Sequence, residues 1–347
     1  MSAHPIAILS AGLVTSVGHS APATCAAVRA KIALPVETRY SDGSGQWLLA
    51  HQVSLPRPWR GVSKLAAMAS MAMSEALTGV KASDRPAIPL LLCVAEPERP
   101  GRTEGLDDRL LQMVGASSGF SLARGSRVVA DGRVSVARAL YEARRLLLAG
   151  SHSYVAIVAV DSLISWPTLK TFLAQDRVLT SRNSNGFMPG ESAGALLVSI
   201  PDGRPGLLCH GIGFGSERAT IDSGLPLRAD GMVEAVQQAL DDAGAKMHDL
   251  DFRISDLSGE QYYFKEAALT LARTLKQRKA TFDIWHPAES VGETGAAIGA
   301  LMLAVAEAGC RKGYATGKAM LAHFSGDTGS RAACVLAYAG EPSEMLT

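Results

Sequence analysis

The feature that most constrains the fold is a repeat of the same order of elements in the two halves of the chain. Apolar runs of strand length alternate with segments of helical spacing, and after the Pro- and Gly-containing residues 202–206 this alternation begins again. Residues 190–194 (GESAG) lead into the last strand predicted in the first half, and residues 326–330 (GDTGS) lead into the last one in the second. We infer a duplication, with the halves at residues 1–204 and 205–347.

The alternation also predicts the arrangement of these elements. The first half has predicted strands at 6–9, 89–94, 127–130, 154–160 and 193–200, and the second at 207–214, 252–254, 281–285, 319–324 and 332–338. Several are apolar throughout, as expected for strands that are covered on both faces. We predict an α/β fold with mixed, largely parallel sheets, whose duplicated halves stack in five αβαβα layers. A doubly wound single sheet would leave the duplication unexplained.

Composition excludes several classes of function. The 34 Lys and Arg residues nearly balance the 33 Asp and Glu residues, so we expect no nucleic-acid or membrane partner. The five Cys residues are scattered, which argues against a disulfide framework and a metal site. No phosphate-binding or dinucleotide motif appears, so no cofactor is expected. The chain shows neither a signal peptide nor an apolar run of roughly 18 residues, and a cytoplasmic location is expected.

Four motifs carry a resemblance to a known family. Residues 10–18, 186–198, 222–244 and 292–300 resemble, in this order, motifs of the β-ketoacyl-(acyl-carrier-protein) synthases. The second motif, GFMPGESAGALLV, is the most specific, and together the matches cover nearly the whole chain. The resemblance identifies a divergent member of the thiolase superfamily, and it implies the thiolase-like fold with its two βα halves in five layers.

The same resemblance implies a catalytic set that this sequence lacks. Condensation in the family requires a Cys at the N-terminus of a buried helix and two His residues that stabilise developing negative charge. Counting back from Gly150 places the Cys position at or within about two residues of Arg133, where no Cys occurs. Ser135 is the one hydroxyl available there, but the local sequence offers it no adjacent base.

Arg133 has two interpretations. A cation in the first turn of a helix opposes the helix dipole unless it meets an anion. In the first interpretation, Asp131 caps the helix and Arg133 is ion-paired or turned to solvent. In the second, Arg133 fills the former acyl cavity or binds a carboxylate or phosphate in it.

The two His positions are also replaced. Asp256 or Leu257 occupies the first position, after the strand at 252–254, and Glu293 occupies the second. Glu293 either caps the helix that it opens, or it forms a general base with His323. A cavity that joins Arg133, Asp256 and Glu293 would favour ligand binding or catalysis, whereas side chains that plug it would favour a scaffold.

These replacements predict a ketosynthase-like protein that has lost condensing activity and acts as a scaffold, partner subunit or accessory binding protein. The resemblance also implies a homodimer through the strand at 127–130, which precedes the expected nucleophile helix, with a heterodimer with an active ketosynthase as the alternative. An acyl-carrier protein or another assembly protein is a further candidate partner. The alternative function is a residual acyl transferase, decarboxylase or thioesterase that acts on acyl-carrier or CoA thioesters through Asp256, Glu293 and His323. Binding of a small ligand without turnover is the third possibility.

Overall fold

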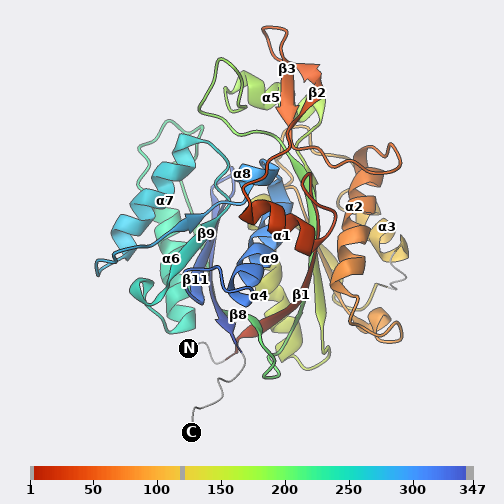
Figure 1. Ribbon diagram of the computed structural model, residues 1–347, viewed down its shortest axis with the longest axis vertical. Coiled ribbons are helices and arrows are strands. Elements are labelled where there is room, and N and C mark those ends of the chain that lie inside the picture. The colour runs from red at the N-terminus through yellow and green to blue at the C-terminus, as the bar shows by residue number, and fades with distance from the viewer. Residues whose placement is uncertain (1–3, 118–121, 341–347) are drawn as a thin grey trace.

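The strands of the computed structural model, which describes residues 4–117 and 122–340, repeat one order in the two halves (Figure 1). Ten strands form one sheet, in the order β10-β9-β11-β12-β8-β1-β7-β6-β4-β5. The strands of the first half are β1 (Ile6–Val14), β4 (Leu90–Val94), β5 (Arg127–Ala130), β6 (Val155–Ser162) and β7 (Glu191–Ser199). Those of the second half are β8 (Gly206–Ser216), β9 (Phe252–Ser255), β10 (Ile284–Trp285), β11 (Ala319–Ser325) and β12 (Ser330–Ala339).

The order β5-β4-β6-β7-β1 in one half matches β10-β9-β11-β12-β8 in the other, strand for strand. The two sets are joined where residues 6–8 of β1 pair with residues 207–209 of β8. The predicted duplication is confirmed by this correspondence. The exact division between residues 204 and 205 stays a prediction.

The alternation of side chains along the strands places the helices in layers. In β6, Val155, Ile157 and Ala159 pack in the cluster that contains α4 (Ser135–Leu148) and α9 (Ile298–Arg311). The intervening Ala156 and Val158 pack against α2 (Gly61–Ala76) on the opposite face, where α3 (Arg109–Ser117) also lies. Because side chains alternate along a strand, α4 and α9 lie between the two halves of the sheet. The predicted five-layer α/β arrangement is confirmed.

The outer face of the second half is covered by α6 (Asp230–Ala243) and α7 (Gln261–Thr274), seen at the left of Figure 1. Leu321 of β11 and Ala333 of β12 pack against α6 on this face, while Ala322 and Ala332 face the central helices. Three shorter helices complete the described fold: α1 (Ala21–Arg29), α5 (Trp166–Ala174) and α8 (Ala288–Val291). Among the described residues, no helix combines the length and the apolar character that crossing a bilayer requires.

One expectation about the sheet is wrong. The pairings β4–β5, β4–β6, β9–β11 and β9–β10 are parallel, and the remaining pairings of the large sheet are antiparallel. The sheet is therefore mixed but not largely parallel. Apolar runs indicate strands that are covered on both faces, but they do not specify the direction of the neighbouring strand.

Two other differences concern local structure. The helix predicted to begin at Glu293 begins instead with the 3₁₀ turn η4 (Gly295–Ala297), because Glu293 itself forms a bridge with Pro189. The hairpin of β2 (Val36–Ser41) and β3 (Trp47–Ala50) was not predicted, nor was α5, and both lie at the top of Figure 1.

Candidate functional site

The two central helices begin with the same backbone geometry. β5 leads through Asp131 into the 3₁₀ turn η2 (Gly132–Val134) and then into α4, while Thr294 leads into η4 and α9. Gly132 and Gly295 both have φ of 54°. A Cβ atom on Gly132 would lie 2.1 Å from a carboxylate oxygen of Glu96, so this turn requires glycine. Arg133 therefore lies at the start of a central buried helix, where the resemblance places the nucleophile.

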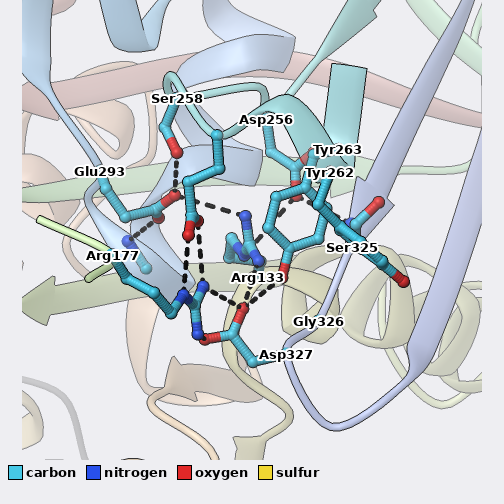
Figure 2. Close-up of polar contacts among 12 residues, drawn as sticks. Arg133, Arg177, Asp256, Ser258, Tyr262, Tyr263, Glu293, Ser325, Gly326 and Asp327 are labelled. Carbon is cyan, nitrogen blue, oxygen red and sulfur yellow. Dashed lines mark hydrogen bonds and ion pairs between the residues drawn. The ribbon is translucent and has the colours of Figure 1, made fainter. Parts of the chain in front are cut away.

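Arg133 is buried among carboxylates of the second half. Its side chain donates through Nη2 to Asp327 Oδ1 (2.6 Å) and through Nη1 to Glu293 Oε2 (3.4 Å), and its Nε lies 3.8 Å from Asp256 Oδ2. The guanidinium carbon also lies 4.3 Å from the centre of the Tyr263 ring. Figure 2 shows these groups converging on Arg133. Only 5% of Arg133 is exposed, so it fills the site and binds carboxylates of its own chain.

The predicted capping role of Asp131 is wrong. Asp131 precedes η2, but its side chain makes no capping hydrogen bond. Its carboxylate accepts instead from Nε of Arg138 (2.9 Å), which lies seven residues further along, on the more exposed side of α4. Asp131 therefore points away from the site and is not the anion that neutralises Arg133.

A second arginine, Arg177, completes the network. It donates to both carboxylate oxygens of Glu260 (2.7 and 3.0 Å) and to both of Asp327 (2.9 and 3.1 Å). The Tyr263 hydroxyl donates to Asp327 Oδ1 (2.5 Å). Burial alone would raise the pKa of Asp327, but Arg133 and Arg177 hold it well below its usual range. Asp327 is therefore an anion shared by both guanidinium groups.

Of the two candidates for the first His position, Asp256 enters the site and Leu257 does not. Asp256 follows β9, is 1% exposed and accepts a hydrogen bond from the backbone N–H of Ser325 (2.8 Å). Leu257 packs with Tyr263 and Ala267 in a small apolar cluster. Burial raises the pKa of Asp256 to about 6, although Arg133 partly offsets this effect.

Glu293 binds the start of the helix that follows it. Its Oε1 accepts from the backbone N–H of Gly295 (2.9 Å), and its Oε2 accepts from the Ser258 hydroxyl (2.7 Å). The first contact satisfies one of the N–H groups that a helix start leaves without an internal partner. The predicted capping interaction of Glu293 is therefore present, and its second oxygen also faces Arg133.

The alternative pairing of Glu293 with His323 is not present. His323 shares its side of β11 with Leu321, which packs against α6 on the outer face. Among the described residues, no hydrogen bond or ion pair joins His323 to Glu293. Burial and the nearby Arg253 lower the pKa of His323 to about 3, so its imidazole is neutral. The prediction failed because alternation along β11 turns His323 away from the central helices.

The ionic network leaves almost no free space. The cavity lined by Arg133, Arg177, Glu260, Glu293 and Asp327 has a volume of ≈ 10 Å³. A cavity of this size holds about one water molecule. The two guanidinium groups and the surrounding carboxylates therefore fill the space around Arg133.

Several residues of this network were not predicted as site residues: Arg177, Ser258, Glu260, Tyr263 and Asp327. Asp327 lies in the GDTGS segment that revealed the duplication. A charged residue in a Gly-rich loop next to a predicted strand could therefore have identified Asp327 as a candidate site residue. Arg177 lies more than 80 residues before its partner Glu260, and no pattern in the sequence connects them.

Comparison with known proteins agrees with this architecture. No protein-family model and no curated protein sequence matches the chain. A solved structure described as a type II polyketide synthase acyl-carrier protein in complex with its ketosynthase (AntDE:AntF) matches with a TM-score of 0.81 at 15% identity. That match covers 97% of this chain and 100% of the other. The chain has the thiolase-like fold of the ketosynthases.

Two further ketosynthase structures match over similar lengths. The ishigamide ketosynthase/chain length factor has a TM-score of 0.78 at 16% identity, covering 97% of this chain and 100% of that chain. The ketosynthase ApeO in complex with its chain length factor ApeC, from Xenorhabdus doucetiae, has a TM-score of 0.78 at 11% identity, with coverages of 97% and 98%. Within this ketosynthase fold, Arg133, Asp256 and Glu293 meet at one point, as the sequence resemblance implied.

The raised pKa of Asp256 predicts a pH-dependent effect of the substitution Asp256→Asn. Between the unfolded pKa of 3.8 and the folded pKa of about 6, the folded protein holds a proton that the unfolded chain has lost. Stability therefore falls as the pH rises through this window, by on the order of 3 kcal/mol in total. Asn cannot titrate, yet it can still accept the Ser325 N–H. We expect Asp256→Asn to gain stability relative to the wild type as the pH rises.

Urea unfolding of both proteins between about pH 4 and pH 7 measures this difference. The other titrating groups are common to both proteins, so their contributions largely cancel in the comparison. A stability difference that stays constant over the whole range would contradict a raised pKa for Asp256.

Proposed function

We propose that this chain is a ketosynthase-like protein that does not condense acyl groups and acts as a structural partner or accessory protein. The observation that supports this proposal is the closed site around Arg133, where ion pairs within the chain occupy the reaction space. A scaffold needs the fold and its surfaces but not an open cavity. If the protein is a scaffold, we expect side chains to fill the cavity between Arg133, Asp256 and Glu293.

The available nucleophiles also support loss of condensation. Burial raises the pKa of Cys93 to about 12 and the pKa values of Cys25 and Cys310 to about 11, which disfavours the reactive thiolate. Ser135 is fully buried, and its hydroxyl donates to the backbone oxygen of Gly132 (2.6 Å). A serine needs a base to take its proton, and this one is bonded to a carbonyl instead.

A residual acyl transferase, decarboxylase or thioesterase finds less support. That alternative requires Asp256, Glu293 and His323 to act together on a thioester. Asp256 and Glu293 both face Arg133, whereas His323 lies on the outer face of β11. The remaining ≈ 10 Å³ admits neither a thioester nor an acyl chain.

Turnover of thioesters tests the loss of activity. We expect purified protein, incubated with acetyl and malonyl thioesters of an acyl-carrier protein and of CoA, to gain no acyl adduct. We also expect no thioester consumption above the rate in buffer. Mass spectrometry of the protein and of the products measures both quantities, with an active ketosynthase as the positive control.

Glu293→Ala and Glu289→Ala form a matched pair of variants for this assay. Glu289 is an exposed acid on α8 that pairs with His286 outside the site. Turnover in the wild type that Glu293→Ala abolishes and Glu289→Ala preserves would contradict the inactive scaffold and support a residual enzyme.

The free edge of the sheet supports an assembly role. β5 is the last strand of the ten, and within the described parts of the chain its residues 127–130 pair on one side only, with β4. An unpaired edge of this kind can extend a sheet across a two-fold axis. The neighbour ApeO is described in complex with a chain length factor, and AntDE in complex with an acyl-carrier protein. We extend the proposal to a homodimer through β5, with a heterodimer with an active ketosynthase as the alternative and an acyl-carrier protein as a further partner.

Light scattering distinguishes these assemblies. A homodimer gives a mass near twice the 36.3 kDa of one chain. If the protein forms a heterodimer, the isolated protein has the mass of one chain. A larger complex then forms when an active ketosynthase from the same genome is added. A mass near 36.3 kDa in both experiments would contradict assembly through β5.

A further inference from the structure

A groove with a volume of ≈ 480 Å³ lies beside the β2–β3 hairpin, in a part of the protein that the proposed function does not use. Its walls come from β2, the loop before α2, the first turns of α2, and the segment between β6 and α5. The hairpin and α5 stand at the top of Figure 1. The groove shares no lining residue with the closed site around Arg133, so its role can be tested independently of whether the chain condenses acyl groups.

The groove carries unneutralised positive charge. Arg39, Arg57, Arg60 and Lys64 line it, and Glu191 is the carboxylate in the same lining. Glu191 is buried and ion-paired with Lys64, which leaves the other three cations without a carboxylate partner in the described part of the chain. The whole protein has a net charge of +1, so this groove concentrates positive charge that the rest of the surface balances.

An aromatic side chain is exposed in the groove wall, and further apolar side chains are exposed on the β2–β3 hairpin outside the groove lining. Trp59, in the groove wall, is 41% exposed and lies under the guanidinium of Arg57 (5.8 Å to the ring centre). On the hairpin, Trp47 is 55% exposed and Leu49 is 42% exposed. Trp and Arg are the residue types that are enriched at the energetically important centres of protein interfaces.

We infer that this groove binds an acidic segment of a partner protein, with carboxylates on Arg39, Arg57 and Arg60 and an apolar side chain against Trp59. The cations come from a strand and a separate loop along the groove, an arrangement that suits an extended chain better than a single compact anion. The exposed Trp59 supplies the apolar contact that a simple polyanion would not use. Electrostatic complementarity would speed the encounter, and the apolar anchor would give specificity.

A direct binding experiment tests this inference on the full-length protein. The probe is a fluorescein-labelled peptide of Glu, Asp and Ser residues with a single central Leu, followed by fluorescence anisotropy. We expect the double substitution Arg57→Glu/Arg60→Glu to weaken binding by about tenfold or more. Both residues are exposed and make no ion pair with the residues that the structure describes, so the fold should be retained.

The matched control is Lys276→Glu/Arg278→Glu, which makes the same change of charge on the exposed loop that follows α7. α7 lies at the left of Figure 1, away from the hairpin at the top. We expect it to change the affinity by less than about twofold at physiological salt, because distant surface charges are screened. A peptide with Ser in place of Leu should bind more weakly than the original.

Four results would overturn the inference. Equal losses in the two double variants would show general attraction by net charge rather than a groove. Equal binding of the Leu and Ser peptides would remove the apolar anchor. Displacement of the peptide by an equal concentration of inorganic pyrophosphate would assign the groove to a small phosphate ligand, and displacement by a short RNA would assign it to a nucleic acid.

Discussion

The ion pair between Arg133 and Asp327 joins the two halves of the molecule at the point where their central helices begin. Arg133 belongs to the first half and Asp327 to the loop between β11 and β12 of the second, and Arg177 holds the same carboxylate from another side. Removing one partner of a buried ion pair typically costs about 3–5 kcal/mol, because the other charge is left without compensation. This contact is one of those that close the site, together with the bonds that Arg177 and Tyr263 make to Asp327.

The charged residues around Arg133 are not the residues that hold the fold together. The five layers are held by apolar clusters on both faces of the sheet, and these clusters contain none of the charged residues around Arg133. A thiolate and imidazole donors can therefore be replaced by an ionic network without loss of the architecture. Architecture alone does not define function, which depends on the residues at the site.

The sequence predicted the architecture better than the site. Apolar periodicity and four ordered motifs identified the duplicated α/β fold, because burial imposes a regular pattern along the whole chain. Arg133, Asp256 and Glu293, which stand where the resemblance implied catalytic residues, do meet in the folded chain. The orientation of His323 was not predicted, since it depends on the face that β11 turns inward. The role of Arg177 was not predicted either, because its partners are distant in sequence and only the folded chain brings them together.

A double-mutant cycle on Arg133 and Asp327 tests the closed site most directly. The free energy of unfolding would be measured for Arg133→Ala, Asp327→Asn and the double variant, with Arg145→Ala, an exposed arginine of α4, as the control. We predict a coupling energy between the two sites of about 1–3 kcal/mol and a loss below about 1 kcal/mol for the control. If Arg133→Ala cost no more than Arg145→Ala, and the two site substitutions were additive, the site would be open in solution and the account would be wrong.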